Sequence, residues 1–322
     1  MSSGLSRFRV LRALAVVCLF VALTALMTYP LSVAPARLAV NLGADTRLFV
    51  WTLMWDLHAL VRQPFALFDA NIFFPERHTL AFSESLFGVA LLAAPWLALG
   101  GGPLLAMNMT ALLSCALSGI GACVLARRLR IGMTGALVSG VVFAFSPPRF
   151  LRIGQLHLTS VQWIPFCLAF LHAYLEGGKR RHLLAAAAFF TVQALCSGHG
   201  AVFLAVSALA LVAYHAVIAT SFSAPKLVRD LGLGGALVLA LNAPFAWPYL
   251  QVRREMGFER SLAEAADGSP NAISFLNSPA HAHRLVLDLF SATAAVDENT
   301  TWRTPALRER SSSVRLAHVL FR

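Results

Sequence analysis

The feature that most constrains this chain is a series of long apolar stretches joined by short polar or basic segments. About 20 apolar residues cross the hydrocarbon core of a bilayer as one helix. The apolar stretches predict spans at about 13–34, 79–99, 103–126, 132–147, 158–176, 183–197, 200–220 and 231–250. Only 13% of the residues are charged, whereas an average soluble domain has about 25%. We therefore expect an all-α, polytopic transmembrane bundle of roughly eight spans, and not a soluble enzyme.

The first span and the loop after it need separate treatment. Three arginines precede the apolar run 13–34, which is longer than the signal-peptide core of about 7–15 residues, so we expect an uncleaved helix. Segment 48–62 is also apolar, but as a helix it would reach only about 22 Å, short of a core of about 30 Å. Asp56 within it adds an insertion cost of about 2.5–3.5 kcal/mol. The segment is therefore predicted as an interfacial helix in a first outward loop at about 35–78, with Trp51, Trp55, His58 and Arg62 on one face.

The basic residues indicate which side of the membrane each loop occupies. They form three groups separated by pairs of spans: Arg127, Arg128 and Arg130; Lys179, Arg180 and Arg181; and Lys226 with Arg229. Loops rich in Lys and Arg stay in the cytoplasm. The net charge of +11 is thus explained without a nucleic-acid partner. Residues 147–160, 197–200 and the polar chain from about 251 then face outward.

One feature of this topology is inconsistent. A cytoplasmic N-terminus followed by three crossings would place Arg127 outside, against the other two basic groups. Either segment 48–62 enters the membrane, or segment 79–99, which carries Glu84, is re-entrant. Both alternatives remain open at this point.

The domain organisation follows the same pattern. We expect a transmembrane unit over 1–250, a periplasmic polar segment over 251–302 and an atypical Arg-rich tail over 303–322. The five cysteines all lie in apolar stretches without a C-x-x-C pair, which predicts neither a disulfide framework nor a zinc site. The chain has no P-loop, G-x-S-x-G or G-x-G-x-x-G motif.

Asp45 is the first candidate for chemistry. It follows a Gly-Ala turn just ahead of the interfacial segment and stands near Arg47. A carboxylate at the membrane surface can take a proton from an acceptor hydroxyl when substrate binding excludes water. The alternative is a solvated turn aspartate with no catalytic role.

A second cluster lies in the outward stretch 147–162. Arginine forks suit phosphate oxygens, while His and Gln side chains bind sugar hydroxyls or phosphate. The candidates are Arg149, Arg152, Gln155, His157 and Gln162. Two snorkelling arginines and a helix cap are the alternative. Glu84 and His199, which interrupt other apolar stretches, complete the set, since an ionisable residue at membrane depth is a functional candidate.

Several strings resemble the bacterial membrane glycosyltransferases of the GT-C class, in particular the YfhO-type branch. They are GADTRLFVWTLMWDLHAL, NIFFPERHTLAFSESLFGVALLAAP, LARRLR, FAFSPPRFLRIGQLHLTSVQWIPF, SGHGAVF and PYLQVRREMGFERSLAE, between about residues 10 and 280. The resemblance implies a polyprenyl-phosphate sugar donor, an active site open to the periplasm and a carboxylate in the first outward loop as base or metal ligand. Asp45 matches that carboxylate, although relatives have Gly-Asp where this chain has Gly-Ala-Asp. Ser85 also departs from the histidine expected there.

The resemblance predicts a multi-pass protein of the bacterial inner membrane that moves a sugar to an acceptor at the periplasmic face. Asp45 would be the base, Arg149 and Arg152 would bind the carrier phosphate, and the remaining candidates would orient sugar or phosphate. No cofactor is implied, and a divalent metal and the oligomeric state are left open. The alternatives are a non-catalytic lipid or solute transporter, with Glu84 lining its path, and a structural membrane subunit. Because family members continue through further helices, we expect a truncated or frameshifted reading frame before the Arg-rich tail.

Overall fold

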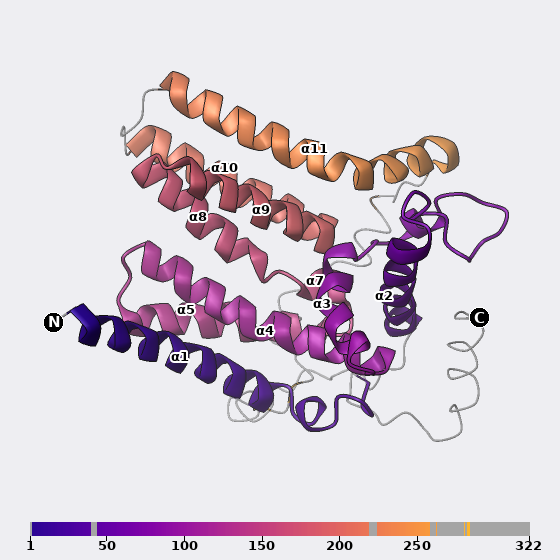
Figure 1. Cartoon of the computed structure of the whole chain (residues 1–322), viewed down its shortest axis with the longest axis horizontal. Coiled ribbons are helices and arrows are strands. Elements are labelled where there is room, and N and C mark those ends of the chain that lie inside the picture. Colours follow the sequence, from indigo (N-terminus) through magenta and orange to yellow (C-terminus); the bar gives the residue numbers. More distant parts are fainter. Residues whose placement is uncertain are drawn as a thin grey trace.

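The protein is described here by a computed structural model, which covers residues 2–39, 44–218, 224–257, 262, 280 and 282–283. Every regular element in these ranges is a helix. The long helices lie side by side in one bundle (Figure 1). They are α1 (Ser2–Met27), α4 (Pro103–Arg128), α5 (Met133–Phe145), α8 (Trp163–Gly177), α9 (Arg180–Cys196), α10 (Gly198–Ile218) and α11 (Ala224–Met256).

The bundle has the lengths and composition of a membrane protein. Within the described ranges, five helical stretches are long and apolar enough to cross a bilayer: Val10–Met27, Pro103–Arg128, Leu156–Gly177, Gly198–Ile218 and Pro225–Met256. Helices α10 and α11 leave most of their apolar side chains exposed, which suits contact with lipid. The predicted all-helical class is confirmed, and the long apolar helices fit a membrane bundle.

The predicted span at 79–99 does not form one continuous helix. A short 3₁₀ turn, η2 (Thr79–Phe82), is followed by extended backbone at Ser83 and by a left-handed Leu86, and only then does α3 (Phe87–Ala98) begin. Twelve helical residues reach about 18 Å, too short for a core of about 30 Å. Helix α3 packs against α2, α4 and α9 at one end of the bundle. Of the two alternatives for the topology, the re-entrant segment fits this geometry.

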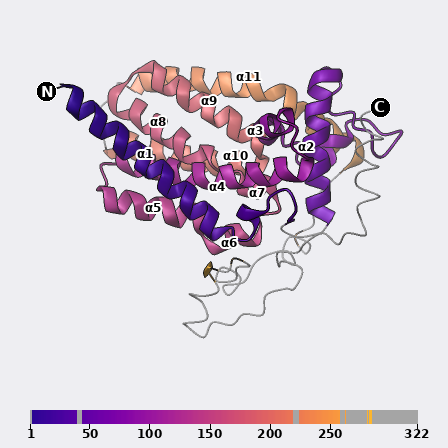
Figure 2. The ribbon, with the colours of Figure 1, turned by 60° about the horizontal axis from the view of Figure 1, so that its bottom comes forward.

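Helix α2 (Ala44–Arg62) corresponds to the predicted interfacial segment and runs across the direction of the long helices (Figures 1 and 2). Part of its aromatic face is buried against the protein. Trp55 is only 8% exposed and donates Nε1–H to the carbonyl of Leu67 at 2.9 Å. Phe68 and Leu80 belong to the same apolar cluster. The face expected to anchor at lipid headgroups is therefore partly covered by the chain that follows α2.

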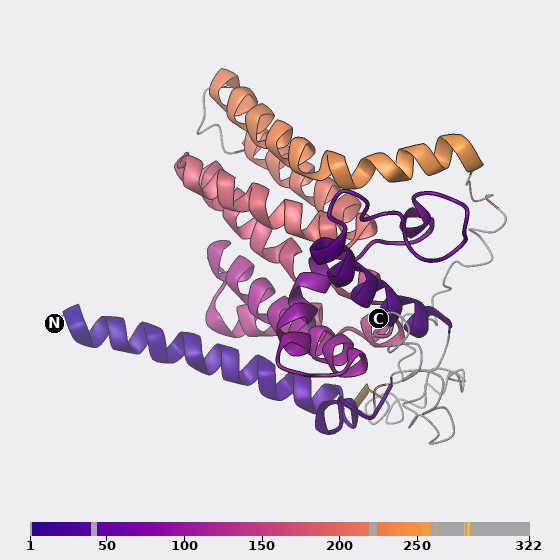
Figure 3. The ribbon, with the colours of Figure 1, turned by 45° about the vertical axis from the view of Figure 1, so that its right-hand side comes forward.

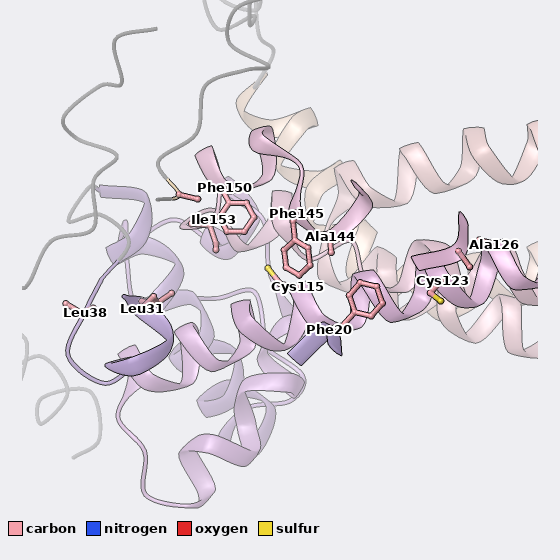
Figure 4. Packing of buried hydrophobic residues seen from close by; sticks show 12 residues of the cluster. Phe20, Leu31, Leu38, Cys115, Cys123, Ala126, Ala144, Phe145, Phe150 and Ile153 are labelled. Carbon is pink, nitrogen blue, oxygen red and sulfur yellow. The ribbon is translucent and has the colours of Figure 1, made fainter. Parts of the chain in front are cut away.

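Helices α1, α4 and α5 pack through small residues. Phe20 of α1 is completely buried in an apolar cluster with Cys115 and Phe145 (Figure 4). A Cβ atom at Gly119 or Gly140 would collide with the Phe20 ring. Gly121 similarly allows Pro165 and Phe166 of α8 to approach α4. Close helix packing of this kind is typical of membrane bundles.

The two ends of the bundle differ in character (Figures 1 and 3). The N-terminal end of α1, the α4–α5 and α8–α9 connections, the end of α10 and the start of α11 lie at one end. That end carries all three basic groups. Helices α2 and α3 lie at the other end, with the short helices α6 (Pro147–Leu151) and α7 (Leu156–Thr159). The candidate site is at this second end. The polar segment 251–302 and the tail 303–322 lie almost wholly outside the described residues.

Candidate functional site

The site is built where four segments of the chain meet at the end of the bundle that carries α2. These segments are the first turn of α2, the extended residues before α3, the α6–α7 region and the first turn of α10. Most of the candidates predicted from the sequence gather here: Asp45, Glu84, Arg152, His157 and His199.

Asp45 is held by a short hydrogen-bonded chain. Gln155 donates from Nε2 to Asp45 Oδ2 at 2.5 Å, and Arg152 donates from Nη1 to Gln155 Oε1 at 3.2 Å. Asp45 stands in the first turn of α2, where backbone N–H groups favour a negative charge. Asp45 and Arg152 are both exposed. The amide of Gln155 thus couples an accessible carboxylate to an accessible guanidinium.

Glu84 is bound to the start of α10. Its Oε2 accepts the backbone N–H of Gly198 at 3.0 Å, and its Oε1 lies 2.8 Å from Nδ1 of His199. A carboxylate at a helix N-terminus satisfies an unpaired donor and interacts favourably with the helix dipole. The cost of a glutamate in an apolar stretch is offset in this way, and the SGHG turn supplies its partner.

His157 lies between these two groups. Its ring is 4.8 Å from the ring of Phe49 and 6.0 Å from that of His199. The charges of Glu84, Asp45 and Arg152 all act on it. Its Nδ1 is buried and has no hydrogen-bond partner within the described part of the chain. His157 therefore connects the two hydrogen-bonded groups, Arg152–Gln155–Asp45 and Glu84–His199, into one site.

Two predicted site residues lie elsewhere, inside the bundle. Arg149 is only 8% exposed and donates to Ser118 Oγ at 2.9 Å, to Ser114 Oγ at 2.9 Å and to the carbonyl of Thr159 at 2.7 Å. Gln162 is fully buried, and its Oε1 accepts from Ser114 Oγ at 2.7 Å. These bonds fasten the α6–α7 region to α4. Contact with a substrate at the exposed cluster is not available to Gln162.

A hollow of about 460 Å³ adjoins the cluster. Its lining is Val142, Phe143, Ser146, Pro148, Arg149, Arg152, Leu158 and Val161. Arg152 belongs both to this apolar hollow and to the chain that ends at Asp45. The hollow is thus mostly apolar with the Arg152 guanidinium in its lining, a combination that suits a molecule with an apolar part and an anionic part.

Arg47 and a possible metal site are the last points predicted from the sequence. Arg47 is exposed on α2, two residues after Asp45. Among the residues that the structure describes, no group of three or more His, Cys, Asp or Glu side chains could hold a metal ion. Sequence reasoning assigned no role to Phe49, and it placed Gln155 in the outward cluster without its contact to Asp45. Gln155 follows Arg152 by three residues, a spacing at which neighbours on a helical turn meet, and that was the available signal.

Comparisons with protein families, with curated proteins and with solved structures found no match to this chain. A proposal for its function therefore rests on the residues of the site and on the arrangement of the helices.

Proposed function

We propose that this chain is a membrane glycosyltransferase of the GT-C kind, which moves a sugar from a polyprenyl-phosphate donor to an acceptor hydroxyl at the periplasmic face of a bacterial inner membrane. The observation that carries the proposal is the meeting of an acid, a histidine and an arginine beside an apolar hollow, namely Asp45, His157 and Arg152. Such a set combines a proton acceptor, polar groups for a sugar and a cation for a phosphate.

The orientation in the membrane follows from the charged ends of the bundle. The end with the three basic groups is cytoplasmic by the positive-inside rule, so the site at the opposite end faces the periplasm. Helices α1, α4, α5, α8, α9, α10 and α11 run between the two ends of the bundle in alternating directions, whereas α3 lies at the site end alone. When segment 79–99 is not counted as a crossing, the N-terminus and the three basic connections all lie on the cytoplasmic side.

Donor binding is assigned to the hollow. The polyprenyl chain lies against Val142, Phe143 and Leu158, and the phosphate meets Arg152, whose planar fork suits phosphate oxygens. Arg149 lines the same hollow, but its terminal nitrogens are occupied by Ser114, Ser118 and Thr159. Arg149 thus supports the wall while Arg152 makes the phosphate contact.

Asp45 acts as the base. One of its oxygens is occupied by Gln155, which leaves the other for the acceptor. As the acceptor oxygen attacks the sugar carbon, the bond from that carbon to the phosphate oxygen breaks, and the acceptor proton passes to Asp45. The products are the glycosylated acceptor and the polyprenyl phosphate.

The test compares Asp45→Asn with wild type in proteoliposomes that contain polyprenyl-phosphate sugars, measuring release of polyprenyl phosphate. Loss of a general base should lower turnover by about 10²–10⁴-fold while donor binding survives. Asp69→Asn is the matched control, because Asp69 lies in the same loop but only accepts from the backbone of His78 and contacts its ring. Equal turnover of the two variants would exclude Asp45 as the base. Donor binding by the wild type without any release would favour a transporter.

A further inference from the structure

Glu84 and His199 form a carboxylate–histidine pair, although 115 positions separate them in the chain. The two oxygens of Glu84 have separate partners, the backbone N–H of Gly198 and the ring of His199. A carboxylate only accepts hydrogen bonds, so the His199 proton in this contact lies on Nδ1. The other ring nitrogen, Nε2, is then the one that meets a substrate. This arrangement is the usual way in which a protein sets the tautomer of a working histidine.

Capping of α10 alone does not account for the pair. One carboxylate oxygen accepts the Gly198 N–H and Ser197 Oγ accepts the Gly200 N–H, so the capping of α10 makes no use of the His199 ring. The His199 side chain is 62% exposed, and that of Glu84 only 22%. Holding an exposed imidazole in one place loses side-chain entropy and gains little stability. The contact therefore indicates a requirement of the site rather than of the fold.

The surroundings of His199 connect it to the proposed chemistry. The neighbouring titratable and charged groups are Glu84 on the segment before α3 and His157 on α7, with Asp45 and Arg152 acting on the far side of His157. His199 thus belongs to the same cluster as the proposed base but takes no part in the chain from Arg152 to Asp45. Two proton-transfer groups with different environments are the usual basis for separate acid and base roles.

We infer that His199 is the catalytic acid of the proposed transfer and that Glu84 is its positioning residue; the inference rests on the proposed function. As the bond between the sugar carbon and the phosphate oxygen breaks, its electron pair stays on that oxygen. Protonated His199 donates the Nε2 proton to the same oxygen, and the ring is left neutral with Nδ1–H on Glu84. Asp45 passes the proton from the acceptor to solvent, and solvent reprotonates His199.

The glutamate at position 84 has to be a carboxylate for this role. A glutamine there has one oxygen that accepts and one amide nitrogen that only donates. If the oxygen keeps the Gly198 N–H, the amide N–H groups face Nδ1 of His199, which then has to be unprotonated. Glu84→Gln therefore loses either the cap or the proton on Nδ1. His199→Gln keeps Glu84 and its bond to Gly198, which separates the catalytic effect from the folding effect.

The experiment measures kcat and KM for a polyprenyl-phosphate sugar between pH 5 and 9, with thermal unfolding in detergent as the folding check. His199→Gln should lower kcat by about 10²–10⁴-fold with little change in KM. It should also abolish the fall in kcat on the alkaline side, because a catalytic acid works only while protonated. Glu84→Gln should lower kcat by a smaller factor with little change in KM, because His199 remains but its ring is no longer held with Nε2 toward the substrate.

His78→Gln is the matched control, because His78 also contacts a carboxylate, Asp69, with Nδ1 at 3.5 Å. It should leave kcat and the pH profile unchanged. If His199→Gln keeps both the wild-type kcat and the alkaline limb, the inference about His199 is wrong and the proposed transfer stands. If the wild type releases no polyprenyl phosphate from any donor, the proposed function fails and the inference fails with it.

Discussion

At the level of single residues, this protein treats two buried ionisable groups in opposite ways. Arg149 is buried with three acceptors for its terminal nitrogens. Asp56 of α2 is completely buried, and neither of its oxygens has a partner within the described residues. Burial without a partner raises the pKa of the Asp56 carboxyl well above its usual range. The acid is therefore tolerated in its neutral form, which removes most of the cost expected for a charge on this helix.

Asp56→Asn should accordingly stabilise the protein at neutral pH. Because the pKa of Asp56 is raised in the folded state, wild type is most stable below the unfolded pKa of about 4 and loses stability as pH rises toward the folded pKa. Asparagine does not titrate, so the variant should be more stable near pH 7 by about 1–3 kcal/mol, and the difference should vanish at low pH. Thermal unfolding in detergent between pH 4 and 8 measures this, with the exposed Asp69→Asn as control. A difference that stays constant with pH would contradict the assignment.

Arg149 and Arg152 provide a second comparison at this scale. Arg149→Gln should reduce stability, because each buried acceptor left unpaired costs about 1–3 kcal/mol. Arg152→Gln should leave unfolding unchanged but weaken binding of a polyprenyl-phosphate donor by roughly ten- to a hundredfold, the value of about 1.5–3 kcal/mol for one charge-assisted bond. Measurements of donor affinity and of the unfolding temperature for both variants test these two expectations. The reverse pattern would show that Arg149 makes the phosphate contact.

At the level of elements, the packing of α1 against α4 and α5 depends on Phe20 and on the two glycines beside its ring, Gly119 and Gly140. The Cβ of Gly119→Ala or Gly140→Ala would overlap a ring that is buried on all sides, so α1 has to move away. Overpacking of this kind costs about 1–3 kcal/mol. The expected result is a lower unfolding temperature in detergent for each variant.

Gly235→Ala in α11 is the matched control for these two variants. Position 235 has no atom near the place of a new Cβ, and alanine is the better helix former by about 1 kcal/mol. This variant should be no less stable than wild type. If Gly235→Ala lowered the unfolding temperature as much as Gly119→Ala, alanine would destabilise any helix of this bundle, whatever the contacts of the glycine it replaces.

The helices themselves could largely be predicted from the sequence, because apolar stretches and helices coincide in a membrane bundle. Stretch 103–126 corresponds to α4 (Pro103–Arg128) and stretch 183–197 to α9 (Arg180–Cys196). The last stretch, 231–250, underestimates α11 (Ala224–Met256), because the helix continues at both ends into charged residues of low hydropathy, such as Lys226 and Arg229 before it and Arg253 after it. The break before α3 depends on the backbone at Ser83 and Leu86, which hydropathy does not encode.

At the level of the whole molecule, the composition of the site could be predicted and its contacts could not. Asp45, Glu84, His157 and His199 were assigned from their chemistry and from loops on the same side of the membrane. That Glu84 meets the start of α10 depends on how α3 and α10 pack. Arg149 and Arg152 are three residues apart, but one points into the bundle and the other lies at the surface. A difference of that kind is set by the three-dimensional turn, not by residue type.

The orientation of the molecule can be tested with single cysteines in spheroplasts. Cys18 is the only exposed cysteine in the described ranges, so a Cys18→Ser background removes the competing thiol. Leu129→Cys and Lys179→Cys lie at the end with the basic groups and should resist a membrane-impermeant thiol reagent, because positive connections remain in the cytoplasm. Phe65→Cys lies after α2 at the site end, where residue 65 is fully exposed, and it should be labelled. Permeabilised spheroplasts control for reactivity, since all three thiols should then react. Labelling of position 129 or 179 in intact spheroplasts would invert the orientation and place the site in the cytoplasm, where it would need a different donor.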